Sequence, residues 1–342
     1  MKILFLTRRF WPDVGGVEKH VYEVSKRLAK LGHKVTVITQ SQGEKIGIDG
    51  IKIVRIGIFP KNSSEKFQVW NWFWKNRKLI KDANIVHAHD VYFWYWPLKL
   101  LFLSKKSFVT FHGYESYPIK KKAIISRKLS EFLTDGNIIV GEFIKKWYGT
   151  TSDCVTYGGV EMSNLSAGEA DIKNQKLKRP KKDSAVFIGR LDDQTGILEY
   201  AKAVDIIRER YPNFMFEIVG DGKLARHLKK YRPLGFNTNP NYYLRKYNFA
   251  FVSRYLSILE ALANKRLVFA LYDNSIKEDY LKMSPFAKFI IITNSPQKLS
   301  DKVMYFLNNP KEISKFTDPG FKWVKKQGWE EVVRLYLEIW KK

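Results

Sequence analysis

The sequence contains one cysteine, Cys154, and no signal-peptide pattern after Met1. A single thiol excludes an internal disulfide and a cysteine-based zinc cluster, and without a secretion signal we expect the protein in the cytoplasm. Long apolar runs are also missing. The best candidate for a membrane span, residues 91–103, is interrupted by Pro97 and Lys99 and is shorter than the ~20 residues that a spanning helix needs. Any membrane contact is therefore expected to be peripheral.

Acidic residues are scarce beside basic ones. The 342-residue chain has 60 Lys and Arg against 34 Asp and Glu, which gives a formal net charge of +26. Such a charge calls for an anionic partner: a nucleic acid, an acidic membrane surface or a phosphorylated small molecule. The common nucleic-acid-binding motifs are absent, and the glycine loops lie where α/β domains bind small ligands. We therefore expect no nucleic acid among the partners.

The chain length and the order of apolar segments predict two α/β domains. A strand at 2–5, a glycine loop, a helix and a strand at 34–40 open the first, and a strand at 185–189 opens the second after a polar, aperiodic segment. We expect two doubly wound domains that face each other across a cleft. The predicted boundaries are 1–162 for the N-terminal domain, 163–183 for a linker, 184–322 for the C-terminal domain and 323–342 for a C-terminal helix. For this last helix, one of the open alternatives is that it crosses back to the N-terminal domain.

Three residues of the N-terminal half are candidates for ligand contact. Gly15 and Gly16 precede the first helix, where backbone without side chains can approach a ligand at the positive end of the helix. His112 ends a predicted strand, and open α/β sheets bind ligands at the carboxyl ends of their strands. A structural histidine is the alternative at this position. His87 and His89 end the preceding strand and are interpreted as mostly structural, because no third metal ligand is evident.

The C-terminal half offers one carboxylate in a favourable place, Glu260. A buried strand at 247–253 leads into a predicted helix at 256–265, and the free N–H groups of Leu256 and Ser257 in its first turn suit a phosphate. Glu260, about one turn further on, is placed to accept hydrogen bonds from ribose hydroxyls. The alternative is a solvated glutamate on the outer face of an amphipathic helix.

Seven motifs together resemble the retaining glycosyltransferases of the GT-B fold, in the group called family 4. No single motif is decisive, but their order along nearly the whole chain is that of the family. They are the P-x-x-GG-V-E-x-H loop at 12–20, DANIVHAHD at 82–90, TFHGYE at 110–115, TYGGVE at 156–161, FIGRLDDQTGI at 187–197, EIVGDG at 217–222 and SILEALANKRLVFA at 257–270.

The resemblance implies two Rossmann-like domains and a donor, a nucleotide-diphosphate sugar, held mainly by the second domain. Glu260 would bind the ribose, Arg190 the diphosphate, and His112 would lie beside the transferred sugar, with Arg190 and His112 as the catalytic pair. Gly15 and Gly16 would contribute backbone donors from the opposite wall. No cofactor and no metal ion are expected, since the family neutralises the diphosphate with an arginine and helix-end amides. The acceptor would be a glycan or a lipid-linked molecule, used in surface polysaccharide or glycolipid synthesis.

Two positions depart from the family pattern. Val252 stands where a second carboxylate is usual, and Thr195, which we keep among the donor-binding residues, stands where a lysine is usual. Arg254 or Lys265 would have to supply the lost cation. The departures indicate either a divergent donor or a catalytically silent nucleotide- or glycan-binding protein. We favour divergence because Arg190 and the other matching residues occur together.

Aromatic and lysine-rich segments suggest where the protein works. The stretches 70–74 and 92–96 are rich in Trp, Tyr and Phe and are followed by lysines, and 120–122 is a run of three lysines. Rings and cations of this kind suit an anionic bilayer surface, although the aromatic residues would equally serve as core. We predict a protein bound peripherally to the inner face of the cell membrane.

Overall fold

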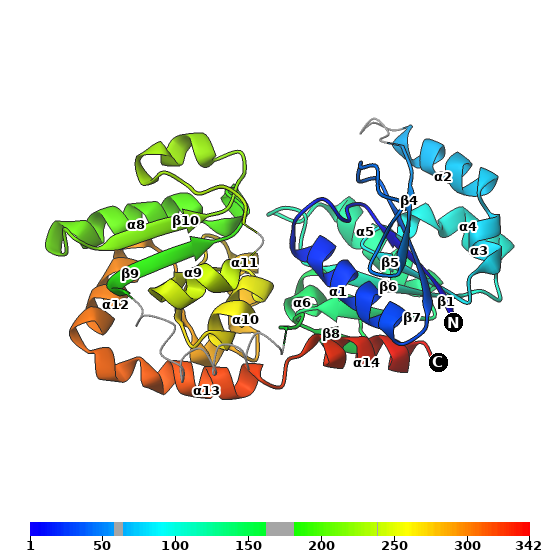
Figure 1. Cartoon of the computed structure of the whole chain (residues 1–342). Helices are drawn as coiled ribbons and strands as arrows, with labels where there is room; N and C mark the ends of the chain where they lie inside the picture. Colours follow the sequence, from blue (N-terminus) through cyan, green and yellow to red (C-terminus); the bar gives the residue numbers. More distant parts are fainter. Residues whose placement is uncertain (58–63, 162–180, 238) are drawn as a thin grey trace. The chain divides into compact units, whose positions relative to one another are not determined.

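The computed structural model describes residues 1–57, 64–161, 181–237 and 239–342 (Figure 1). The chain forms two compact units: unit 1 is residues 1–158 together with 329–342, and unit 2 is residues 159–328. The greater part of the predicted linker, 163–183, lies outside the described residues. Its end does not remain linker, because the first strand of unit 2 already begins at Lys181.

Unit 1 is built on a sheet of eight strands in the order β3-β4-β2-β1-β5-β6-β7-β8. All neighbours are parallel except the pair of β3 and β4. The central strands are buried on both faces, which explains their continuous apolar sequence. The strands are β1 Lys2–Thr7, β2 Lys34–Thr39, β3 Gly47–Ile48, β4 Ile51–Arg55, β5 Ile85–His89, β6 Lys106–His112, β7 Gly136–Val140 and β8 Cys154–Thr156.

The helices of unit 1 include one from the far end of the chain. Helix α14, Trp329–Ile339, packs against α1, Gly16–Lys30, and against β8 (Figure 1). Its apolar stripe, which includes Trp329 and Tyr336, is buried in unit 1, as is Trp340 directly after the helix. The other helices are α2 Glu65–Lys75, α3 Lys78–Asp82, η1 Tyr92–Trp94, α4 Trp96–Leu101, α5 Lys121–Leu133 and α6 Phe143–Tyr148.

Unit 2 has a five-stranded parallel sheet in the order β10-β9-β11-β12-β13. From β9 the chain adds β10 on one side of the sheet and then β11, β12 and β13 on the other side. The direction of winding therefore reverses between β9 and β11. Open α/β sheets bind ligands at the carboxyl ends of the strands that flank such a reversal. The strands are β9 Lys181–Ile188, β10 Met215–Val219, β11 Tyr247–Phe251, β12 Leu267–Leu271 and β13 Ile291–Thr293.

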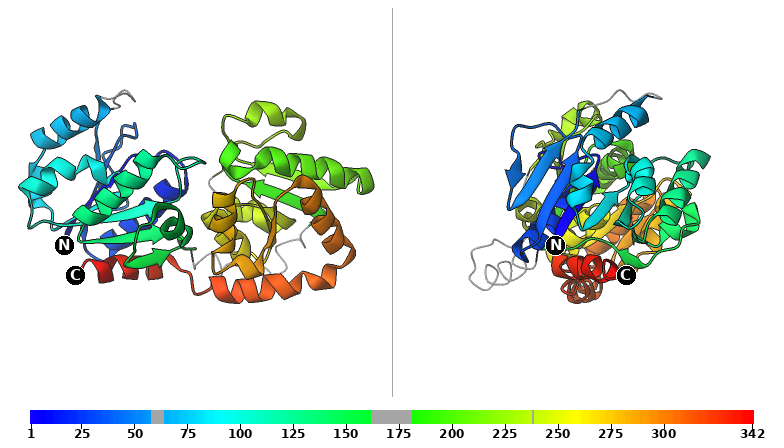
Figure 2. Two further views of the ribbon diagram at one scale, coloured as in Figure 1. Left: turned by 180° about the vertical axis from the view of Figure 1, so that it is seen from behind. Right: turned by 90° about the vertical axis from the view of Figure 1, so that its right-hand side faces the viewer.

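Helices cover both faces of this sheet (Figure 2). Helices α8 and α12 pack together over a core of strand residues such as Phe187 and Phe269, and α10 contacts β12, α9 and α13. These helices are α8 Ile197–Arg210, α9 Pro240–Lys246, α10 Tyr255–Ala263, α11 Ser275–Lys282, α12 Pro296–Asn308 and α13 Ser314–Val324, and the 3-10 turns are η2 Asp193–Thr195, η3 Ala225–Tyr231, η4 Ala287–Phe289 and η5 Pro310–Glu312.

Several predicted bounds need correction. The helix expected at 256–265 is α10, which begins at Tyr255 and ends at Ala263, because Lys265 takes a left-handed backbone conformation that a helix cannot continue. The C-terminal helix expected at 323–342 is instead the last two residues of α13, a short connection and α14. The prediction of two doubly wound α/β domains is confirmed by the two parallel sheets.

Candidate active site

The loop after β9 presents Arg190 at the carboxyl edge of the unit 2 sheet. The Arg190 side chain is 52% exposed, and its Nη2 lies 3.2 Å from Oδ2 of Asp192. Thr195 is buried at 3% exposure, and its hydroxyl lies 2.8 and 2.7 Å from the carbonyl oxygens of Arg190 and Asp192. The Thr195 side chain therefore folds back on its own loop and holds the backbone that carries Arg190.

The glycines of the GDG segment explain how this loop is fixed. A Cβ on Gly220 would lie 1.8 Å from the carbonyl oxygen of Gly189, and a Cβ on Gly222 would lie 2.6 Å from that of Leu191. Only glycine allows the loops after β9 and β10 to lie so close together. Hydrogen bonds from the N–H of Gly189 to Val219 O and from the N–H of Leu191 to Asp221 O join the two loops.

The start of α10 lies beside the same loop. The Ser253 hydroxyl donates to the carbonyl oxygen of Thr195 at 3.0 Å, which ties the end of β11 to the loop after β9. The first amide of α10, that of Tyr255, donates to the Tyr280 hydroxyl at 2.9 Å and is not available to a ligand. The next two amides, of Leu256 and Ser257, are in the first turn, where a helix has no carbonyl partners of its own for its N–H groups.

Glu260 follows in the second turn of α10 with a partly exposed side chain. Arg190 and Thr195 thus follow β9, and Leu256 and Ser257 follow β11 in the first turn of α10, with Glu260 further along the same helix.

The two cations considered as replacements for the usual lysine occupy opposite ends of α10. Arg254 immediately precedes the helix, and its Nη2 donates to Oε1 of Gln194 in the loop after β9, at 2.5 Å. Lys265 follows the other end, with its Nζ 3.9 Å from Oδ1 of Asp318 and 4.7 Å from the ring centroid of Phe321. Lys265 is therefore in the wrong place to reach a diphosphate at the start of the helix, whereas Arg254 is at the correct end.

Sequence reasoning missed Lys277, a buried lysine of α11 whose Nζ donates to the carbonyl oxygen of Ser253. The sequence carries no signal for it, because a lysine in a polar helical segment is normally solvated.

In unit 1, Gly15 and Gly16 form the entry to α1. A Cβ on Gly16 would meet no atom within 4 Å, so this part of the first turn is uncovered, whereas a Cβ on Gly15 would lie 2.3 Å from Oε2 of Glu18. The space beside Gly16 is therefore open, whereas the Glu18 carboxylate occupies the space beside Gly15.

His112 belongs to a cluster of histidines. Its Nε2 lies 2.9 Å from Nδ1 of His89, its ring packs edge-on against His20 with centroids 4.8 Å apart, and its backbone N–H donates to Oδ1 of Asp90 at 2.8 Å. His87 completes the cluster at 5.2 Å from the ring of His89. The structural interpretation of His87 and His89 agrees with their complete burial.

Helix α14 closes this cluster from the side. The Tyr336 hydroxyl lies 3.0 Å from Nε2 of His20 and 2.8 Å from Oγ1 of Thr110, and Trp340 Nε1 donates to Nδ1 of His87 at 3.0 Å. Burial lowers the pKa of His20 to about 3, and burial with neighbouring rings lowers the pKa of His87, His89 and His112 well below the usual value. All four rings are neutral at pH 7, so His112 can act as a hydrogen-bonding group and not as a cation.

Among the residues that the structure describes, no three or more His, Cys, Asp or Glu side chains form a group that could hold a metal ion.

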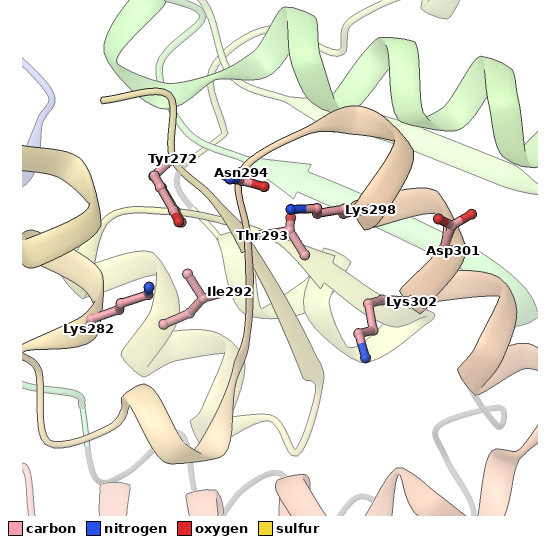
Figure 3. Close-up of a pocket in the computed structure, with 8 residues that line it drawn as sticks. All are labelled: Tyr272, Lys282, Ile292, Thr293, Asn294, Lys298, Asp301 and Lys302. Atoms are coloured by element: carbon pink, nitrogen blue, oxygen red, sulfur yellow. The ribbon is translucent and has the colours of Figure 1, made fainter. Parts of the chain in front are cut away.

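A separate recess of ≈ 300 Å³ lies at the carboxyl ends of β12 and β13 (Figure 3). None of the predicted site residues lines it. Its walls are Tyr272, Lys282, Ile292, Thr293, Asn294, Lys298, Asp301 and Lys302.

Comparison with known families covers most of the chain. Residues 14–153 match the family described as Glycosyltransferase Family 4, and residues 169–323 match the one described as Glycosyl transferases group 1.

The curated relatives share limited identity. In Arabidopsis thaliana, one subunit of phosphatidylinositol N-acetylglucosaminyltransferase is 24% identical over 248 residues, which is 68% of this chain and 55% of the relative. The GPI3 subunit of the enzyme with the same name in Schizosaccharomyces pombe is 24% identical over 250 residues, 65% of this chain and 52% of the relative. The chain thus spans about half the length of these curated relatives.

Solved structures match the whole fold. A glycosyltransferase from Rickettsia africae has a TM-score of 0.73 and 18% identity, with 99% of this chain and 98% of that chain covered. HepE from Anabaena, solved with UDP and glucose, also has a TM-score of 0.73, with 13% identity and the same coverage. These neighbours confirm the predicted architecture of two Rossmann-like domains.

Proposed function

Because the chain belongs to the family 4 glycosyltransferases with a GT-B fold, we propose that it is a retaining enzyme that transfers a hexose-type sugar from a nucleotide-diphosphate sugar. One observation carries the proposal. An exposed arginine follows β9, and two first-turn amides and the Glu260 carboxylate belong to the helix after β11, so all follow the two strands between which the winding of the unit 2 sheet reverses. This is the combination that a nucleoside diphosphate needs.

In this proposal each group has one task. Arg190 and the amides of Leu256 and Ser257 neutralise the charge that grows on the diphosphate as its bond to the sugar breaks, because a fixed guanidinium and oriented N–H groups need little rearrangement. Glu260 accepts hydrogen bonds from the ribose hydroxyls. Neutral His112 forms a hydrogen bond with the transferred sugar, and Gly15 and Gly16 offer backbone N–H groups to the phosphates or the acceptor.

For the acceptor we propose a lipid-linked molecule or a glycan. The support is the name of the curated relatives, which are subunits of phosphatidylinositol N-acetylglucosaminyltransferase, and an N-acetylhexosamine donor is accordingly included among the sugars to test. Because those relatives are named as parts of a larger enzyme, the proposal also includes a protein partner.

Only part of the aromatic surface predicted to contact an anionic membrane is exposed, and it includes Trp74 at 51% exposure. The aromatic residues Phe73, Tyr92, Trp94 and Tyr95 are buried core, so these parts of 70–74 and 92–96 do not meet lipid. No helix in the described ranges is long and apolar enough to cross a bilayer.

Helix α5 instead presents an apolar stripe to the outside. Ile125, Leu129 and Phe132 follow one another at helical spacing and are 66%, 39% and 84% exposed. Lys121, Lys122 and Lys128 on the same helix supply cations. Helix α4 packs beside α5 and adds the exposed Leu100 and Leu101. We propose that this α4–α5 surface lies on the membrane, where a basic amphipathic helix binds anionic lipid.

A panel of donors tests the enzymatic proposal. Thermal unfolding with UDP-, GDP- and ADP-linked glucose, and with UDP-N-acetylglucosamine, should show stabilisation by one of them, since a ligand at 100 times its dissociation constant adds ~2.7 kcal/mol. Turnover of the stabilising donor is then measured with a lipid extract as acceptor. Absence of any stabilisation would contradict the proposal, and binding without turnover would favour the silent nucleotide-binding protein, for which the apolar Val252 is the specific support.

A further inference from the structure

Lys277 is a buried cation at the edge of unit 2 where the donor is proposed to bind. It lies in the first turn of α11 and is 2% exposed. Its Nζ donates to the carbonyl oxygen of Ser253, the residue before the N-cap of α10, and lies 4.5 Å from the ring centroid of Tyr280. The hydroxyl of the same Tyr280 accepts the first amide of α10. Lys277 and Tyr280 together thus set the position of the start of α10.

The surroundings of this ammonium are mostly positive. The N-terminal ends of α10 and α11 both contribute the positive end of a helix dipole, and a lysine in the first turn of a helix is unfavourable for that reason. Arg254 stands at the N-cap of α10, with its guanidinium 5.8 Å from the Tyr280 ring centroid. The charged groups that act on Lys277 are Arg254, Asp273 and Asp192, and Asp192 already pairs with Arg190 at 3.2 Å.

Burial is the largest influence on Lys277 and lowers its pKa well below the usual value, Arg254 lowers it further, and Asp273 and Asp192 oppose the change. A buried ammonium without a full counter-charge destabilises a protein, and strongly perturbed ionisable groups are concentrated at functional sites, where an anionic ligand can supply the missing charge. The carboxyl ends of β9 and β11 are the place where that ligand would bind.

We propose that Lys277 is a positioning residue of the donor-diphosphate site, which holds the Ser253 carbonyl and supplies, from α11, the positive charge that Thr195 does not supply in the loop after β9. This inference rests on the proposed function. It also predicts that a diphosphate, by stabilising the charged ammonium, causes Lys277 to take up a proton when the ligand binds.

The proposed role of Lys277 is tested by a substitution that removes the charge of the side chain and keeps its approximate length. Lys277→Met is compared with wild type and with Lys282→Met, a lysine of the same helix that is exposed and paired with Glu278 at 2.5 Å. Affinities are measured for UDP, GDP and ADP, each beside its monophosphate. For the nucleotide that binds, the preference for diphosphate over monophosphate should fall roughly ten- to a hundredfold in Lys277→Met and remain in Lys282→Met, because the second phosphate loses a nearby positive charge.

Proton uptake on ligand binding is a second measurement, and a lysine with a purely structural role would not contribute to it. Calorimetry at several pH values between 8 and 10, in pairs of buffers of different ionisation enthalpy, should show uptake on diphosphate binding by wild type and by Lys282→Met, and none by Lys277→Met. At these pH values the phosphates are already fully ionised, because their last pKa is about 6.

The outcomes separate the two proposals. If no diphosphate binds wild type, the proposed function fails. If one binds wild type and Lys277→Met keeps both the diphosphate preference and the proton uptake, this inference alone is overturned. An equal loss of monophosphate and diphosphate affinity in Lys277→Met, together with a lowered melting temperature, would also overturn it, because that result indicates a structural role.

Discussion

At the scale of single residues, Glu260 and Arg190 should affect different steps of the reaction: donor binding and departure of the diphosphate. Glu260→Ala leaves ribose hydroxyls unpaired, so donor affinity should fall by roughly 1.5–3 kcal/mol. Arg190→Ala should depress kcat more than donor affinity, because its charge matters most when the diphosphate leaves. Donor titration and turnover are measured for both, with Glu209→Ala on the exposed end of α8 as a control. Wild-type behaviour of both variants would place the site elsewhere.

The buried histidines of unit 1 should make the protein sensitive to acid. The pKa of His20 is lowered from 6.5 to about 3, so the unfolded chain binds a proton that the folded chain does not. The stability that this histidine contributes is complete above pH 6.5 and is lost progressively as the pH falls toward 3, roughly 1.4 kcal/mol at pH 5.5. His87, His89 and His112 act in the same direction.

Chemical denaturation between pH 8 and pH 5 checks this. The free energy of unfolding should decrease below pH 6.5 in wild type and less steeply in His20→Gln, which retains a partner for Tyr336. His227→Gln, at an exposed position of unit 2, should follow wild type. A stability that stays constant down to pH 5 would show that these rings are already charged or solvated.

At the scale of elements, α5 should control membrane binding. Replacing Ile125 and Phe132 by Ser removes the most exposed apolar groups of its stripe, so binding to anionic vesicles should weaken about tenfold or more, at ~25 cal/mol per Å² of apolar surface no longer buried in lipid. Leu31→Ser, a comparably exposed apolar residue after α1, is the matched control.

Co-sedimentation with vesicles of increasing anionic lipid, at low and high salt, provides the measurement. Binding should increase with anionic lipid and decrease with salt, because the lysines act through screened charge. If the wild-type protein binds neither anionic nor neutral vesicles at low salt, the membrane proposal fails and the acceptor is a soluble glycan or a small molecule.

At the scale of the whole molecule, the chemistry should proceed without a metal ion. Arg190 and the first-turn amides of α10 supply the positive charge that a cation would bring, and Lys277 adds to it under the inference above. Turnover should therefore be unchanged after dialysis against EDTA and in its presence. Activity that disappears with EDTA and returns with magnesium or manganese would contradict this.

The sequence by itself determined the two parallel sheets, the glycine loops and the family, because strand and helix periodicity and short motifs depend on neighbours along the chain. Its candidates Arg190 and Thr195 lie in the loop after β9, and Leu256, Ser257 and Glu260 lie in α10. Ser253, shortly before α10, is hydrogen-bonded to that loop.

Only the tertiary structure decided which side chains are core and which charges are buried. Tyr92 and Trp94 look like membrane anchors in sequence but are covered by other elements, and the stripe of α5 is exposed because nothing in the described residues packs over Phe132. Tyr336 reaches His20 across 316 positions of sequence, and Lys277 reaches Ser253 from another helix. Burial and long-range contacts of this kind depend on how elements pack, and a local pattern of residues does not contain that information.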